Sequence, residues 1–270
     1  MSCLHKLPPA HLRWEKIREP LAVTSALVEK YSHALGHLPN AKKMLFPLLL
    51  FESIFSLESQ KIYGSLPSLL LEKKSAHQSI WNYLAALRFC SREILTKPLS
   101  KRMLCTAHNL IKTGKKGGTL SYRTKQNWIG PENCTKEEAY FLPPKAQEVP
   151  QWMENLLHYC NQIDPFPLVQ IAIAFAQFLI IHPFMDGNGR VARILIPLLL
   201  YKKNLLPYPL LFLSRYFKDH RLTYFRQLFA ITEKQQWEQW ILFFLKGIAR
   251  EAKRARALVL RMHAMQPATD

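Results

Sequence analysis

A stretch of twelve residues between two apolar segments carries the side chains best suited to chemistry. Residues 182–193 read HPFMDGNGRVAR. His182 is the side chain in this stretch that exchanges a proton near neutral pH, and Asp186 offers the kind of carboxylate oxygen that Mg²⁺ prefers. Arg190 and Arg193 are three residues apart, on one face of a helix, and arginine binds phosphate through two parallel hydrogen bonds. A base, a metal ligand and two arginines so close together predict transfer of a phosphoryl or nucleotidyl group.

The local sequence also predicts how the backbone presents these groups. Pro183 favours a helix end at or near His182, because the residue before a proline avoids the right-handed helical region. Gly187 and Gly189 let the chain turn tightly, and a second helix is expected from about Arg190. The unpaired N–H groups at its start form an anion site beneath the arginines. A single His-Pro pair or glycine-rich turn would most often be structural, so the combination carries the prediction.

The elements that must position this loop are mostly helices. Residues 1–20 are expected to form an arm interrupted by Pro8, Pro9 and Pro20. Apolar periodicity predicts helices from Thr24 or Ser25 to Gly36, and at 44–62, 68–95, 98–111, 151–163, 166–181, 190–203, 219–232 and 235–260. The segment 113–150 is rich in Gly, Pro, Asn and Lys, and 121–129 and 139–142 are expected to pair as a short β-hairpin flap. The fold class is therefore all-α, divided into an arm and helix (1–40), a catalytic domain (41–260) and a tail (261–270).

The amino-acid composition and the cysteine pattern indicate the kind of cellular compartment in which the protein works. The 270 residues are 49% apolar and 21% charged, which excludes general disorder. The five cysteines are scattered and never spaced as C-x-x-C, which argues against a disulfide scaffold or a zinc site and for a reducing compartment. No apolar stretch is long enough to span a bilayer, and residues 1–14 lack the apolar core of a signal peptide. We expect a cytoplasmic protein without stable membrane insertion, with export into another cell as an effector left open.

The charge is strongly positive, at +18 from 37 basic and 19 acidic residues. Seven cations and no acid occur between 101 and 126, and five cations with one acid between 250 and 261. These runs indicate either solvated helix faces or attraction to an acidic or nucleic-acid-associated partner.

The loop resembles the signature of the Fic (filamentation induced by cAMP) family, H-P-F-x-[D/E]-G-N-G-R-x-x-R, at every specified position. The resemblance continues in TKQNWI at 124–129, FLPP at 141–144, LSRYF with HR at 213–221, and WEQW to FL at 237–245. It covers residues 45–255.

This resemblance implies an all-α, Fic-type helical bundle that transfers AMP from ATP and Mg²⁺ to a Ser, Thr or Tyr hydroxyl of a target protein. It implies a base at His182 and a magnesium ligand at Asp186. The nucleotide phosphates would lie against Gly187, Asn188, Gly189, Arg190 and Arg193, and Phe184 would anchor the loop. Gly189 favours AMP transfer, since the Doc-like kinases of the superfamily carry lysine there. The alternatives are transfer of another nucleotide or phosphate-linked group, or a non-enzymatic basic scaffold.

Two further sites follow from the resemblance. Tyr224 and Phe225 are candidates to stack on the adenine, although two core aromatics on an amphipathic helix would look the same. The flap, at about 127–142, would receive an extended segment of the target protein by strand addition.

The resemblance also indicates a regulatory departure. Many members carry an inhibitory helix, [S/T]-x-x-x-E-[G/N], whose glutamate pairs with the second arginine of the signature. Within the helix at 44–64 the aligned residues 59–64 read SQKIYG, which places Tyr63 where the glutamate would be. A phenol offers no carboxylate at neutral pH. We expect either a constitutively active enzyme or restraint by another group, such as Glu58 in a shifted register or a regulator in trans. The sequence does not indicate an oligomeric state.

Overall fold

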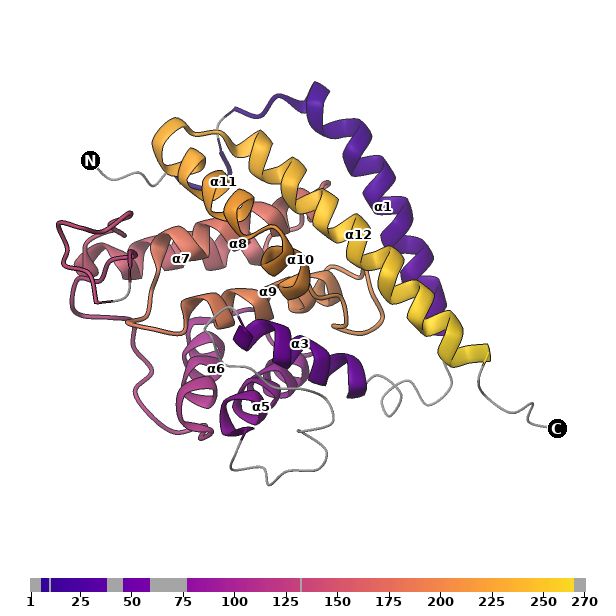
Figure 1. Cartoon of the computed structure of the whole chain (residues 1–270), viewed down its shortest axis with the longest axis horizontal. Helices are drawn as coiled ribbons and strands as arrows, with labels where there is room; N and C mark the ends of the chain where they lie inside the picture. The colour runs from indigo at the N-terminus through magenta and orange to yellow at the C-terminus, as the bar shows by residue number, and fades with distance from the viewer. Residues whose placement is uncertain (1–5, 10, 38–45, 59–76, 132, 265–270) are drawn as a thin grey trace.

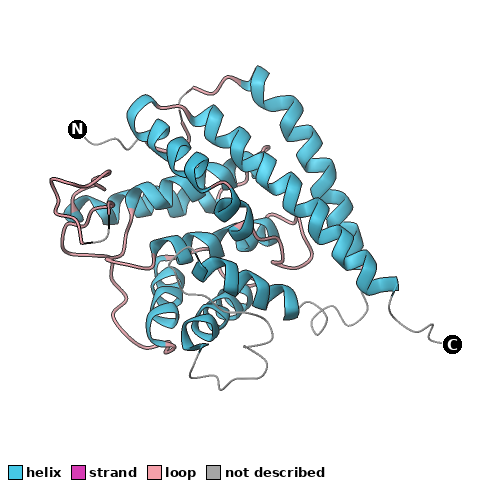
Figure 2. Cartoon of the chain, in the orientation of Figure 1, coloured by secondary structure: helices cyan, strands magenta, loops and turns pink. Residues whose placement is uncertain are grey.

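The computed structural model describes residues 6–9, 11–37, 46–58, 77–131 and 133–264, and this part of the chain is a helical bundle (Figures 1 and 2). The all-α class is thereby confirmed. In chain order the helices are α1 (Trp14–Gly36), α3 (Phe46–Glu58), α5 (Gln78–Glu93), α6 (Lys101–Thr113), η2 (Ala146–Glu148), α7 (Val149–Asn161), α8 (Pro167–Ile181), α9 (Asn188–Lys202), α10 (Ser214–Asp219), α11 (Arg221–Lys234) and α12 (Trp237–Ala264).

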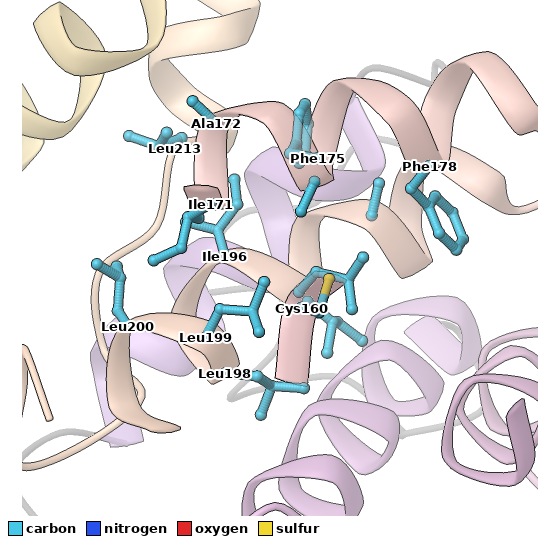
Figure 3. Close-up of a cluster of buried hydrophobic side chains, with 14 of the residues drawn as sticks. Cys160, Ile171, Ala172, Phe175, Phe178, Ile196, Leu198, Leu199, Leu200 and Leu213 are labelled. Carbon is cyan, nitrogen blue, oxygen red and sulfur yellow. The ribbon is translucent and has the colours of Figure 1, made fainter. Parts of the chain in front are cut away.

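The centre of the bundle is the pair α8 and α9. All fourteen residues of α8 after Pro167 are buried, and all of them except Gln170 and Gln177 are apolar, so this helix has no polar face. Side chains of α8 such as Ile171 and Phe175 pack with Ile196 and Leu199 of α9 in one cluster (Figure 3). Burying a side chain of this size contributes about 1.5–3 kcal/mol. The two helices that flank the predicted catalytic loop are therefore held rigidly in the core.

The N-terminal helix begins earlier than predicted. Residues 14–20 belong to α1, and Pro20 lies inside it, so the expected arm of 1–20 is wrong beyond residue 13. Proline removes one helical N–H donor, but Ile17 and Leu21 on either side are buried in the main core. Thr24 does not cap the helix; its hydroxyl donates to the carbonyl of Pro20 at 2.7 Å. Burial against the bundle thus outweighs the local helix-breaking signal.

Helices α1 and α12 lie side by side and run in the same direction (Figure 1). The Arg13 amide donates to Glu238 at one end, and His263 Nε2 contacts the His37 carbonyl at the other, at 3.1 and 2.6 Å. No helix in the described ranges has both the length and the apolar character needed to cross a membrane.

The predicted hairpin flap is reduced to a single antiparallel bridge. Ile129 and Phe141 exchange two backbone hydrogen bonds, with N···O distances of 2.9 and 3.0 Å, and the described residues contain no longer strand. The expected strand at 121–129 does not form because its polar groups turn toward the loop after α8. The Arg123 amide, for example, donates to the Pro183 carbonyl at 2.8 Å.

Candidate active site

The loop 182–187 joins α8 to α9 and has a tightly determined backbone. Helix α8 ends at Ile181, as Pro183 predicts, and His182 follows in the left-handed region with φ 51° and ψ 61°. This conformation costs a non-glycine residue about 1–3 kcal/mol, which the surrounding structure must supply. Gly187, with φ 80°, is the N-cap of α9, so the second helix starts at Asn188, two residues before the predicted Arg190. The predicted anion site at the start of α9 therefore lies within the glycine-rich turn.

Two side chains hold the loop from within. Asn188 is buried and bonds both backbone groups of Phe184: its Oδ1 accepts from the amide at 2.9 Å, and its Nδ2 donates to the carbonyl at 2.8 Å. The Phe184 ring points into the protein and stacks on His108 of α6, with centroids 4.1 Å apart and planes 6° from parallel. Asn188 thus has a clear loop-shaping geometry, while its contact with a phosphate stays a prediction.

His182 is prepared to accept a proton. Its Nδ1 lies 3.2 Å from the carbonyl of Leu179. A carbonyl only accepts, so Nδ1 carries the hydrogen and Nε2 is the basic nitrogen. Burial, aided by the positive charge of Arg123, lowers the pKa of His182 to about 4 against the opposing effects of the Leu179 carbonyl and Asp186. The imidazole is therefore neutral at pH 7, the state that a general base requires.

Asp186 is a half-exposed carboxylate surrounded by cations. Partial burial favours its neutral form, but Lys112, the Gly187 amide and Arg190 together hold its pKa below the usual value. Lys112 Nζ lies 2.5 Å from Oδ2, and Arg190 Nη2 lies 3.7 Å away. His108 Nε2 also contacts the Asp186 backbone carbonyl at 3.0 Å.

The donor set of this carboxylate fits Mg²⁺. The described residues hold no group of three or more His, Cys, Asp or Glu side chains arranged for a metal. One accessible carboxylate that acts together with substrate phosphates is nevertheless the usual magnesium arrangement. Lys112 already neutralises Asp186, so an incoming cation would compete with the lysine for Oδ2.

The two arginines of the loop differ in their surroundings. Arg190 is buried, and its Nε has no hydrogen-bond partner within the described residues. Arg193 is held by Ser56 of α3, whose hydroxyl accepts from Nε at 2.8 Å and whose carbonyl accepts from Nη2 at 2.6 Å. Nη1 of Arg193 lies toward the start of α9, only 3.2 Å from where a Cβ on Gly189 would be. A side chain at 189 would therefore crowd the guanidinium against the helix start.

A cavity of about 420 Å³ opens beside these groups. This volume lies within the range of small-molecule sites. At its polar end are His182, Gly189 and Arg193. The rest of its lining comes from α3, α8, the flap, α10 and α11. Most of these residues are apolar or aromatic, among them Phe55, Ile129, Phe141, Phe217, Tyr224, Phe225, Leu228 and Phe229, and the polar ones are Ser214, Lys218, Arg221 and Thr232. Asp186 and Arg190 are not in this lining; they contact each other beside α6.

Tyr224 and Phe225 line the cavity, but in different ways. The Tyr224 ring packs against Phe217 and Trp240, with centroids 4.9 and 5.9 Å apart, so it is also part of the aromatic core. Phe225 is 38% exposed and carries the Arg221 guanidinium 5.3 Å above its ring. Both interpretations of Tyr224 are therefore compatible with its position, and Phe225 is the more accessible ring.

Helix α3 reaches the site through a buried carboxyl. Glu52 is 3% exposed, and its Oε1 accepts from Tyr83 of α5 at 3.0 Å and from Ser214 of α10 at 2.6 Å. One turn later, Ser56 holds Arg193. Tyr63, the predicted regulatory residue, lies outside the described residues, and so does the side chain of Glu58.

Several residues of the site escape the sequence prediction. His108 and Lys112 belong to a basic run that indicated either a solvated helix face or attraction to an acidic or nucleic-acid-associated partner. Their spacing of four residues places both on one side of α6. Arg123 is in the same run, and Glu52 sits in a strongly apolar helix. A carboxylate in such a helix is the one local signal that could have drawn attention to it.

Comparison with known proteins points to one family. Residues 98–200 match the sequence model described as the Fic/DOC family. Protein adenylyltransferase fic-1 of Caenorhabditis elegans is 26% identical over 145 residues, which are 48% of this chain and 25% of fic-1. Protein adenylyltransferase and cysteine protease IbpA of Histophilus somni (strain 2336) is 29% identical over 102 residues, which are 37% of this chain and 2% of IbpA. The chain thus spans a quarter or less of the length of these two relatives.

The fold has a close counterpart among solved structures. A Fic family protein from Desulfovibrio desulfuricans G20 superimposes with a TM-score of 0.75 at 20% identity, over 98% of this chain and 79% of that one. The likeness is one of fold. Together with the matched sequence model and relatives, this likeness identifies the helical bundle and its helix–loop–helix segment as those of the Fic class. The chain is a Fic family protein.

Proposed function

We propose that the protein is an adenylyltransferase, which transfers AMP from ATP to a Ser, Thr or Tyr hydroxyl of a target protein. The observation that carries the proposal is the cavity. The His182 side chain, Arg193 and the N-terminus of α9 line the same cavity as a group of aromatic rings. A nucleotide has the same two parts, an anionic chain and a flat base.

The phosphates would occupy the polar end. The first amides of α9, at Asn188 and Gly189, have no acceptor within the helix and add the positive end of the helix dipole. Arg193 Nη1 faces this point, and the unpartnered Nε of buried Arg190 lacks an acceptor that a phosphate oxygen would supply. The adenine would lie against Phe225, with Tyr224 as the wall behind it.

The transfer forms one bond and breaks one at the α-phosphorus, and it moves one proton. The target hydroxyl oxygen bonds to the α-phosphorus, and the bond from that phosphorus to the bridging oxygen of the β-phosphate breaks. Pyrophosphate leaves with the electron pair, and the hydroxyl proton passes to Nε2 of His182. The lowered pKa of His182 keeps this nitrogen available. Preorganised positive charge at the arginines and at the α9 N-terminus stabilises the charge that develops on the leaving group.

Magnesium would be held by Asp186 together with the phosphates. When bound, it would neutralise charge on the pyrophosphate. Lys112 would then give up its contact with Oδ2 of Asp186.

The target would dock on the flap. Trp128, Tyr140 and Leu142 expose 40%, 67% and 48% of their surfaces there, close to the Ile129–Phe141 bridge. An extended target segment could pair with this edge and place its hydroxyl near His182.

Part of the basic run on α12 is locally neutralised: Arg250 pairs with Asp219 and Arg254 with Glu251, each at 3.1 Å. These pairs favour a solvated helix face over a dedicated polyanion site, so we do not propose the scaffold function.

The test is incorporation of label from α-³²P ATP into proteins of a cell lysate, with wild type beside His182→Ala. We expect labelled bands with wild type and none with the variant, because a positioned base contributes about 10²–10⁴ in rate. Arg88→Ala, on the exposed face of α5, is the control for purification and folding. Equal labelling by wild type and His182→Ala would refute the proposed role of the histidine.

A further inference from the structure

Arg123, in the flap segment before the bridge, makes an unusual set of contacts with the catalytic loop. Its side chain is buried, and the three guanidinium nitrogens donate to three carbonyls. Nε donates to His182 at 2.9 Å, Nη1 to Lys125 at 3.2 Å and Nη2 to Pro144 at 2.5 Å. Its backbone amide adds a fourth bond, to the Pro183 carbonyl at 2.8 Å.

The arginine is not held by a counter-charge. Within the described part of the chain no carboxylate pairs with it, and burial lowers the pKa of the guanidinium. Burying a charge without an ion pair is costly, so this position would ordinarily favour an apolar side chain. An arginine is nevertheless favoured here if the fork geometry of its guanidinium is needed. A lysine would bring the same charge to this site but could not span three divergent carbonyls.

The carbonyls that Arg123 joins belong to three separate segments. Lys125 lies on the first limb of the flap, Pro144 at the end of the second limb, and His182 on the catalytic loop. Asn127 reinforces the last contact, since its Nδ2 donates to the Phe184 carbonyl at 2.9 Å and lies 3.4 Å from the His182 carbonyl. The two limbs of the flap are thereby fastened to the backbone of the residue that adopts the left-handed conformation.

We propose that Arg123 is a positioning residue of the transfer reaction: its guanidinium clamps the base of the flap to the His182 backbone and so sets the orientation of the imidazole relative to a docked target. The inference rests on the proposed function and deepens it. It makes the flap and the catalytic base one rigid unit, so that a target segment bound to the flap is placed in a fixed relation to His182. Arg123 itself touches neither the nucleotide cavity nor Asp186.

The test compares Arg123→Lys and Arg123→Gln with wild type and with Arg88→Gln, an exposed arginine on α5. Lysine keeps the charge and loses the fork, whereas glutamine loses both. We expect both Arg123 variants to lose at least tenfold in the rate of AMP transfer, while ATP still binds with unchanged stoichiometry and with an affinity within about twofold of wild type. Arg88→Gln should match wild type.

Hydrogen–deuterium exchange supplies a measurement that does not depend on activity. Peptides that cover the loop 182–187 should exchange at least tenfold faster in both Arg123 variants, while peptides from the centre of α8 and α9 stay as in wild type. Wild-type rates and wild-type loop exchange in Arg123→Lys would overturn the proposal. Faster exchange throughout the bundle would overturn it as well, because Arg123 would then be a general stabiliser. If wild type transfers no AMP, the proposed function fails, and the exchange comparison alone decides the clamp.

Discussion

Glu52 offers a prediction whose size follows from its surroundings. Burial raises the pKa of this carboxyl to about 7 from an ordinary value of 4.5, and Glu251 acts in the same direction. The hydrogen bonds from Ser214 and Tyr83 and the charge of Arg193 oppose the rise without cancelling it. In Glu52→Gln the amide oxygen can accept the same two hydrogen bonds, so the substitution removes the titration and little else.

The sign of the effect is set by proton linkage. Between pH 4.5 and 7 the folded protein keeps a proton on Glu52 that the unfolded chain has released. The stability of wild type therefore falls as pH rises through this window and is constant, from this cause, above it. The pKa of Glu52 is 4.5 in the unfolded chain and about 7 in the folded protein. At 1.36 kcal/mol per pH unit, this difference corresponds to a loss of about 3 kcal/mol of unfolding free energy across the window.

The assay is urea unfolding followed by far-ultraviolet circular dichroism at several pH values. Relative to wild type, Glu52→Gln should gain about 2–3 kcal/mol of unfolding free energy between pH 5 and pH 8. Glu29→Gln, on the exposed side of α1, removes one negative charge elsewhere. Its unfolding free energy should change with pH in parallel with that of wild type. Parallel curves for wild type and Glu52→Gln would refute the account of a buried carboxyl that holds its proton.

Three further outcomes are expected. In the pH–rate profile of AMP transfer, the midpoint on the acid side should lie well below pH 6, because the lowered pKa of His182 keeps its imidazole neutral there. A midpoint near 6.5 would contradict this. Gly247→Ala should lower the unfolding free energy by about 1–3 kcal/mol, because a Cβ there would lie 2.6 Å from the Tyr216 ring, whereas Gly36→Ala, with open space around it, should not. Asp186→Asn should reduce transfer at least a hundredfold and weaken Mg²⁺ binding to the ATP-loaded protein in calorimetry; unchanged magnesium affinity would exclude Asp186 as the ligand.

The sequence predicted the backbone of the loop 182–187 well because its determinants are local. Pro183, Gly187 and the start of α9 lie within a few residues of one another, and each residue type restricts the backbone directly. Helix α8 could be recognised from its apolar sequence, which only Gln170 and Gln177 interrupt. The proline at 20 misled the prediction because its local cost is smaller than the burial of Ile17 and Leu21 against the core.

The contacts that complete the site join residues far apart in the chain. Arg123 and His182 are 59 positions apart, Lys112 and Asp186 are 74 apart, and Ser56 and Arg193 are 137 apart. Nothing in the spacing of a single sequence brings such residues together. The types of Arg123, Lys112 and Ser56 gave no signal either, since isolated basic and hydroxyl side chains are common on protein surfaces.

The central claim is that the group transferred is AMP. The most direct measurement compares ATP labelled at the α-phosphate with ATP labelled at the γ-phosphate, each given with Mg²⁺ and wild-type protein to the same lysate. Transfer of AMP leaves the α-phosphorus on the target and releases the γ-phosphorus in pyrophosphate. We therefore predict protein-bound label from α-³²P ATP alone, lost in His182→Ala. Protein-bound label from γ-³²P ATP that depends on His182 would show phosphate transfer at this site and contradict the account.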